Sequence, residues 1–309
     1  MLLLKDIVVM FGLAVAVALV CHKLKIPTVV GLILTGVIAG PHGLGLTTEI
    51  DAVEMLAEIG VIFLLFTIGL EFSIASIGHV KRLFFAGGPL QVGVTALAVT
   101  GLSLSLGVNA QQAILFGLVA SLSSTAIILR LLQERSELSS PHGKGTMAIL
   151  IFQDIAFVPM MLVVPFLAGV DADNVWREVG ILVLKVALIW LAIGLAAPRL
   201  VPRLLTRIAR TRSNELFLLS IGVLCFFVAW LTSLAGLSLA LGAFLAGLIL
   251  SDSEHSHRAL ENVLPFRDVF SSFFFVSMGM LLDAGYVMAH LPAVLGMTFL
   301  IMVIKAFVT

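Results

Sequence analysis

Charge is scarce in this sequence, and so is cysteine. Lys, Arg, Asp and Glu make up 12% of the 309 residues, and 18 basic side chains balance 18 acidic ones. Because the net charge is zero and the basic residues are dispersed, the sequence carries no electrostatic footprint for nucleic acid. The two cysteines, Cys21 and Cys225, are far apart and lack metal-ligand spacing, so we interpret them as small apolar side chains.

Catalytic and metal-binding motifs are also missing. The sequence has no H-E-x-x-H motif and no G-x-S-x-G elbow before a helix, so an intramembrane hydrolase has no support and the chain is not predicted to be an enzyme. The run "EHSH", Glu254 to His257, has ligand-like spacing. It lies in a charged loop without further convergent ligands, so a metal site is not predicted there.

Apolar residues dominate instead. The mean hydropathy is +1.17, and runs of about 20 apolar residues recur, each long enough to cross a bilayer core as a helix. The sequence therefore predicts an all-α polytopic membrane protein. Breaks by charge, Pro and Gly divide it into eleven spans, at 2–21, 28–40, 53–72, 83–106, 111–132, 145–168, 176–197, 215–234, 237–251, 266–283 and 292–308.

The distribution of lysine and arginine orients these spans. Fourteen basic residues follow the odd-numbered spans, whereas the loops after even-numbered spans carry only Arg177. Basic loops stay on the cytoplasmic side, so the odd-numbered loops are predicted to be cytoplasmic and the N-terminus external. We expect a multi-pass protein of the bacterial inner membrane.

Two stretches repeat at nearly one offset. "FLLFTIGLE", which starts at Phe63, aligns with "FFFVSMGML", which starts at Phe273, at an offset of 210. Gly31 and Gly36 align with Gly242 and Gly247 at an offset of 211. The repeat maps each span onto the seventh span after it, and an odd shift reverses direction across the membrane. Such inverted repeats are typical of secondary transporters, although chance similarity between Gly-rich apolar segments is the alternative.

The same offset predicts that the repeat is incomplete. Counterparts of Ser123 and Asp154 would fall near positions 333 and 364, beyond the last residue, Thr309. We expect a single transmembrane domain over residues 1–309. In it, spans 1–6 form the first repeat, span 7 is a linker, and spans 8–11 are part of the second repeat of a thirteen-span fold.

A buried amide and carboxylate mark the sixth span. Gln153 and Asp154 lie within an apolar run, where a carboxylate costs about 2.5 to 3.5 kcal/mol and usually marks an ion or proton pathway. A structural carboxylate paired with another helix is the alternative.

Hydroxyls and a lysine complete the polar set. Ser123, Ser124 and Thr125 lie in "SLSST", which could break a helix and supply oxygen ligands to a cation, or bond back within an intact helix. Lys305 lies in an apolar run and needs a carboxylate partner, for which Asp154 is the candidate, unless it extends to the interface. Lys185 is interpreted as interfacial or locally paired, and Glu71 as a solvated helix-end carboxylate.

Five segments resemble one known family. In order along the chain, "GLILTGVIAGPHGLGL", "LAEIGVIFLLFTIGLEF", "SLSSTAIILRLLQERSE", "ILIFQDIAFVP" and "LSLALGAFLAGLILSDSE" are similar to Kef-type bacterial monovalent cation/proton antiporters. The resemblance implies a sodium/proton-antiporter-like homodimer, in which a mobile core carries the site past a fixed dimerisation domain. It places Gln153-Asp154 on the ion-binding helix, Ser123, Ser124 and Thr125 in a broken crossover helix, and Lys305 as the core lysine.

The resemblance also bears on substrate and regulation. Kef-type proteins exchange potassium for protons and are gated through a cytoplasmic nucleotide-binding domain with glutathione as ligand. No cofactor is predicted in this segment, and nucleotide or glutathione regulation would require a domain that this chain lacks. A single Asp after Gln favours potassium, with sodium as the alternative.

These observations predict a secondary active transporter that exchanges a monovalent cation for protons by alternating access. Asp154 would bind either a proton or a cation, with the hydroxyls at Ser123 to Thr125 completing the cation's oxygen shell. A ligand-gated potassium efflux channel, with Asp154 lining its pore, is the alternative. A proton-conducting subunit of a redox complex would need more protonatable groups than the one clear carboxylate and two lysines found here.

Overall fold

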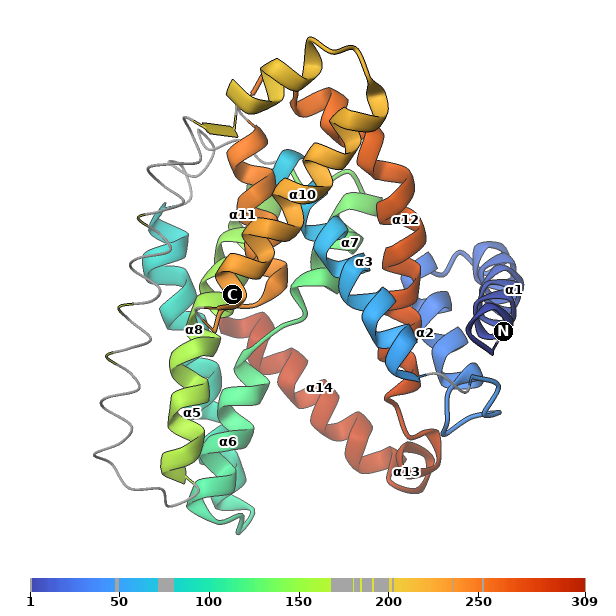
Figure 1. Ribbon diagram of the computed structural model, residues 1–309. Helices are drawn as coiled ribbons and strands as arrows, with labels where there is room; N and C mark the ends of the chain where they lie inside the picture. Colours follow the sequence, from blue (N-terminus) through green and yellow to red (C-terminus); the bar gives the residue numbers. More distant parts are fainter. Residues whose placement is uncertain are drawn as a thin grey trace.

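The computed structural model describes residues 2–47, 50–71, 81–167, 200–201, 203–234, 236–251 and 253–308, with isolated positions 180, 184 and 191. Apart from the isolated positions, the predicted seventh span, 176–197, lies outside the described residues together with Arg177 and Lys185. Every other predicted span is occupied by helix (Figure 1).

The helices follow the predicted spans, with one addition, one interruption and an early start of α12, which begins at Ser256 although the tenth span was predicted to begin at residue 266. The addition is a short helix before the last span, and the interruption divides the fifth span between α6 and α7. The elements are α1 (Leu2–Lys23), α2 (Thr28–Ala39), α3 (Ile50–Glu71), η1 (Leu83–Gly87), α5 (Gly88–Ser105), α6 (Ala110–Ser121), α7 (Thr125–Glu134), α8 (Pro141–Leu167), α10 (Asn214–Ser233), α11 (Leu239–Ser251), α12 (Ser256–Met280), α13 (Ala284–Ala289) and α14 (Leu291–Val308).

Length and hydropathy agree with a membrane protein. Among the described residues, seven helical stretches are long and apolar enough to cross a bilayer, and one of these runs through α6 and α7. The helices α2 and α11 are apolar but shorter, as expected for the second and ninth spans. Short apolar segments in corresponding positions of two repeats are typical of transporters.

The described helices form two groups (Figure 1). The large bundle contains α1, α2, α3, α10, α11 and α12, with α3 packed against both α11 and α12. The site bundle contains η1, α5, α6, α8 and α14. The helix α7 connects them, because it contacts α8 on one side and α2 and α3 on the other.

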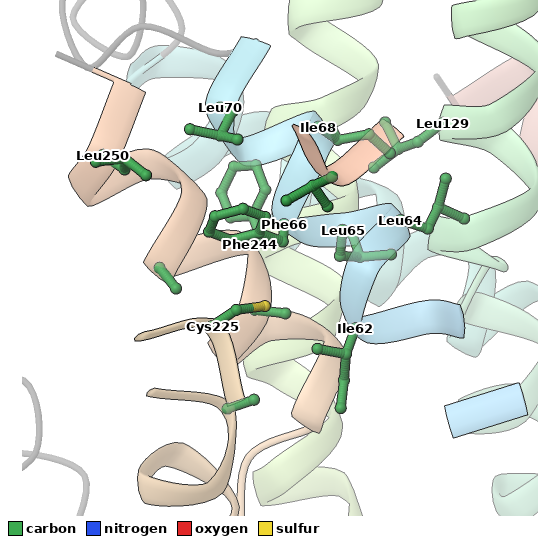
Figure 2. Close-up of a cluster of buried hydrophobic side chains, with 14 of the residues drawn as sticks. Ile62, Leu64, Leu65, Phe66, Ile68, Leu70, Leu129, Cys225, Phe244 and Leu250 are labelled. Atoms are coloured by element: carbon green, nitrogen blue, oxygen red, sulfur yellow. The ribbon is translucent and has the colours of Figure 1, made fainter. Parts of the chain in front are cut away.

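A continuous apolar core lies in the large bundle and reaches the site bundle. Figure 2 shows Phe66 of α3 beside Phe244 of α11, with Ile68 and Leu129 close by. Leu129 belongs to α7, and Leu150 of α8 belongs to the same cluster. The apolar face of α7 is therefore buried against the large bundle while its first residue faces the site bundle.

Helices in the large bundle approach closely at glycines. A Cβ at Gly36 of α2 would collide with the carbonyl oxygen of Val276 in α12, and one at Gly247 of α11 with that of Phe66 in α3. Positions 36 and 247 differ by 211, and positions 66 and 276 differ by 210. One close contact is thus repeated at the offset seen in the sequence.

A second pair of contacts follows the same rule. Gly31 of α2 lies against the backbone of Ala18 in α1, and Gly242 of α11 lies against the backbone of Ala229 in α10. Both members of the first contact are 211 positions before their counterparts in the second. The packing of α1 on α2 therefore corresponds to the packing of α10 on α11.

Candidate functional site

The candidate site is built around the interruption between α6 and α7. Leu122 and Ser124 have extended backbone angles, with φ −77° and ψ 156° for Leu122 and φ −73° and ψ 102° for Ser124. The Ser124 hydroxyl caps α7 by accepting a hydrogen bond from the N–H of Ile127 at 3.4 Å. A helix end leaves backbone groups without intrahelical partners, and lipid offers none, so the protein must satisfy them itself.

Two buried amide side chains form hydrogen bonds with backbone groups of this interruption. Gln153 of α8 accepts the N–H of Ser123 through Oε1 at 2.9 Å, and its Nε2 donates to Oε1 of Gln91 in α5 at 2.6 Å. Gln91 then donates through Nε2 to the carbonyl of Ser121 at 3.3 Å. Gln153 and Gln91 are 3% and 2% exposed, so this chain of hydrogen bonds is formed away from solvent.

The positively charged ammonium group of Lys305 in α14 lies at the end of α6. Its Nζ donates to the carbonyl oxygen of Leu122 and to Oγ of Ser123, the latter at 2.9 Å. A helix C-terminus carries partial negative charge, so an ammonium there is stabilised. The expected pairing with Asp154 was wrong in its geometry: within the described residues no ion pair joins the two side chains, because Lys305 binds the opened backbone instead.

Asp154 lies at the other half of the interruption. Thr125, the first residue of α7, donates through Oγ1 to Oδ1 of the partly buried Asp154 at 3.2 Å. The carboxylate therefore lies near the partially positive N-terminus of α7, which favours negative charge. In the described part of the chain this is its single hydrogen bond, so Oδ2 remains available as an acceptor.

A cavity of about 270 Å³ adjoins these groups. Gln91, Ser123, Gln153 and Lys305 contribute its polar lining, and Thr146 of α8 lies on the cavity wall. At about 30 Å³ per molecule, this volume has room for roughly nine waters. Asp154 is not among the residues that line this cavity. The interruption as a whole brings a carboxylate and hydroxyls together, which are oxygen donors that small hard cations prefer.

The structure brings the sequence-predicted residues together, with one exception in role. Gln153, Asp154, Ser123, Thr125 and Lys305 meet at the interruption, and their part in ion binding stays a prediction. Ser124 is exposed, and its hydroxyl is engaged as the helix cap.

Gln91 is the residue that sequence reasoning missed. Its signal was present, since it is an amide inside the apolar run of the fourth span, as Gln153 is in the sixth. Glu71 is exposed at the end of α3, as expected, but it also accepts a hydrogen bond from Nε2 of Gln133 in α7 at 3.0 Å.

Comparison with known proteins assigns this chain to a family. Residues 7–309 match the transmembrane part of the sodium/hydrogen exchangers. The glutathione-regulated potassium-efflux system protein KefC of Cronobacter sakazakii is 36% identical over 95% of this chain and 47% of that protein. K(+) efflux antiporter 5 of Arabidopsis thaliana is 36% identical over 98% of this chain and 54% of that protein.

A solved structure has the same fold. The sodium proton antiporter MjNhaP1 from Methanocaldococcus jannaschii matches with a TM-score of 0.56 at 20% identity, over 93% of this chain and 72% of that one. The chain spans about half the length of the two curated relatives named above. The similarity to KefC confirms the Kef-type resemblance seen in the sequence. The chain belongs to the sodium/hydrogen exchanger family.

Proposed function

We propose that the chain is the transmembrane part of a secondary active transporter that exchanges a monovalent cation for protons at Asp154. The observation that carries this proposal is the free oxygen of Asp154 beside an interrupted helix whose backbone groups are satisfied by other residues. The carboxylate is not needed to hold the interruption together. It is therefore free to exchange ligands without loss of the surrounding structure.

Competition at one carboxylate gives the exchange its coupling. A protonated carboxyl loses the charge that holds a cation, and a bound cation occupies the oxygens that a proton would take. Thr125 and Ser123 supply further oxygens close to Asp154 or to Lys305. Each substrate therefore displaces the other, and the site moves only one of them at a time.

An inverted repeat provides a route to alternating access. The glycine contacts that recur at offsets of 210 and 211 support it, and so does Gly60, which meets Phe270 at an offset of 210. A residue that touches its own repeat counterpart lies near the axis relating the two copies. In the thirteen-span fold that we propose, a second broken helix would cross the α6–α7 interruption, and a rigid movement of the site bundle would turn it to either side.

The proposed substrate is potassium, with sodium as the alternative. Both curated relatives carry potassium efflux in their names. In this chain a single Asp follows Gln, the pattern that the Kef-type resemblance associates with potassium. We further propose a bacterial inner-membrane location with the N-terminus outside, from the charge distribution. The homodimer and the regulation through a further domain stay predictions.

Exchange in proteoliposomes tests the role of Asp154. A pH gradient is imposed, and proton release is followed on adding potassium or sodium in parallel. Asp154→Asn should abolish exchange, because the amide keeps the shape but can neither bind a proton nor hold a cation by charge. Asp51→Asn removes an exposed carboxylate at the start of α3 and should leave exchange unchanged.

Two results would contradict the proposal. Exchange retained by Asp154→Asn would mean that another group carries the substrate. Cation flux that persists without coupled proton movement would indicate a channel, in which Asp154 lines a pore. Equal rates with sodium and potassium would leave the antiport intact but would remove the preference for potassium.

A further inference from the structure

An open hollow, lined mainly by apolar atoms but carrying three polar side chains, lies at the N-terminal end of α3, away from the interrupted helix. Its volume is about 300 Å³, and it is lined by residues of α3, the start of α11 and the end of α12. Glu54, Glu58 and Ser277 are its polar lining, with Leu239 and Phe274 on its walls. The charge distribution predicts this end of α3 to be external.

The two glutamates are exposed, and among the described residues no basic side chain pairs with them. They are four positions apart on one helix, where like charges repel by about 0.2 to 0.5 kcal/mol. No Lys, Arg or His lines the cavity, and within the described residues neither glutamate forms an ion pair. A cation in the cavity would relieve this repulsion.

Ser277 offers a third oxygen from the opposite wall. It is 8% exposed, and in the described part of the chain its hydroxyl forms no hydrogen bond. Thr67, its counterpart at an offset of 210, is fully buried and donates to the carbonyl of Leu64 at 2.8 Å. Ser277 is therefore a nearly buried residue that lines the cavity, and in the described part of the chain its hydroxyl has no protein partner.

At the other end of the bundle, the repeat counterpart of Glu58 is a carboxylate whose charge is balanced by arginines. Glu58 corresponds at an offset of 210 to Asp268, which accepts hydrogen bonds from Arg267 at 2.7 and 3.0 Å and pairs with Arg130 at 3.5 Å. A cavity of about 260 Å³ lies there, lined by Arg130 and Glu134. The two ends thus have cavities of similar size but different charge.

We propose that the cavity between Glu54, Glu58 and Ser277 binds one hydrated monovalent cation at the external mouth. Its volume holds roughly ten waters at about 30 Å³ each, so the ion keeps much of its hydration shell. The two carboxylates supply charge, and the Ser277 hydroxyl supplies a fixed oxygen. The role of this cation site, which rests on the proposed antiport, is to raise the local concentration of the transported cation on the external side.

Thermal unfolding in detergent tests binding without relying on transport. The whole chain carries Asp154→Asn, which removes the charge of the candidate transport site, and KCl is compared with choline chloride at equal ionic strength. Potassium should raise the Tm, because a ligand that binds only the folded state stabilises it. Adding Glu54→Gln and Glu58→Gln should abolish this rise, whereas adding Asp51→Asn should preserve it.

The outcomes separate the alternatives. The site would be overturned if potassium did not raise the Tm of the Asp154→Asn protein. It would also be overturned if adding Asp51→Asn abolished the rise as fully as the glutamate changes, because general surface charge would then explain the effect. Stabilisation by MgCl2 alone would overturn its assignment to the transported monovalent cation. Adding Ser277→Ala should reduce the rise partly, and an unchanged rise would remove Ser277 from the site.

Transport then tests the sidedness. With cation supplied at the predicted external face, Glu58→Gln should raise the half-saturating concentration about fivefold, as expected for removing one charge about 4 Å from an ion in water. With cation supplied from the other face it should change nothing, and equal effects on both faces would contradict an external site. A wild-type protein without any exchange would contradict the antiport but leave the thermal result to decide the cavity.

Discussion

In the large bundle, helices meet backbone to backbone at several glycines, whereas the site bundle has such a contact between Gly117 of α6 and Ala96 of α5 and adds contacts through amides and an ammonium. Gly36 and Gly247 leave no space for a side chain against the carbonyls that they face. Gln91, Gln153 and Lys305 instead reach between helices to backbone groups of an opened segment. Two kinds of contact therefore hold the helices together: close packing at glycines and hydrogen bonds from polar side chains to the backbone.

The difference teaches which part can rearrange. Lipid provides no hydrophobic drive between helices, so the large bundle depends on close van der Waals packing, which has one well-fitted arrangement. Hydrogen bonds around the interruption can be replaced by bonds to water or to an ion of similar strength. The large bundle is suited to be the fixed part and the site bundle the part that changes ligands.

Breaking the glycine contact should have the largest effect on stability. Gly247→Ala places a methyl group against the carbonyl of Phe66, and backbone cannot move aside as a flexible side chain can. We expect the free energy of unfolding to fall by about 3 kcal/mol, as for an overpacked core. The control is Gly222→Ala in α10, where an added Cβ meets nothing within 4 Å.

Thermal unfolding of both variants in one detergent makes the comparison. Gly222→Ala should keep or slightly raise the Tm, because alanine favours a helix over glycine. A Gly247→Ala protein as stable as Gly222→Ala would mean that α3 and α11 can separate at little cost. The large bundle would then not be the rigid member of the pair.

Removing the Gln91 amide should have the next largest effect, on both stability and exchange. Gln91→Met keeps the volume but leaves the Gln153 Nε2 and the Ser121 carbonyl without their partner. An unsatisfied buried group costs about 1 to 3 kcal/mol, so we expect a loss of about 2 kcal/mol and slower exchange. Gln111→Met, at an exposed position of α6, is the control and should change neither.

The result also sharpens the contrast between the bundles. If Gln91→Met lowers the Tm but exchange per folded molecule is unchanged, the amide chain serves folding alone. If exchange falls while the Tm is retained, water has replaced the amide and the site geometry depends on Gln91. An unchanged protein in both measurements would contradict the role of the amide chain.

Most helices could be predicted from the sequence, because lipid imposes a simple rule on apolar runs. The short second and ninth spans were predicted from apolar runs bounded by charge and by Pro and Gly, and they are short apolar helices. The candidate site residues from Ser123 to Lys305 were predicted from polar groups placed where they are expensive. The repeat offset was read from Gly36 and Gly247, and close contacts recur at the same offset.

Partner choice inside the site was harder to predict. Opposite charge suggested that Lys305 pairs with Asp154, but a helix interruption creates backbone acceptors that compete for the ammonium. Gln91 was missed although it is an amide inside an apolar run, because the sequence does not give its partners across the helices. Periodicity gives the face of a helix, but it does not give which groups meet across helices.

Replacing Ser124 should have the smallest effect, and it separates capping from ion binding. Its hydroxyl accepts the N–H of Ile127 at the start of α7, so Ser124→Ala should cost about 1 kcal/mol of stability, measured as a lower Tm. Ser124→Asn restores a capping oxygen and should recover the Tm. Because the side chain is exposed and already engaged, exchange per folded molecule should stay near wild type in both. If Ser124→Asn keeps the Tm and loses exchange, the hydroxyl is an ion ligand, as the sequence predicts. The opened segment would then provide a ligand to the transported cation in addition to its contacts with the site bundle.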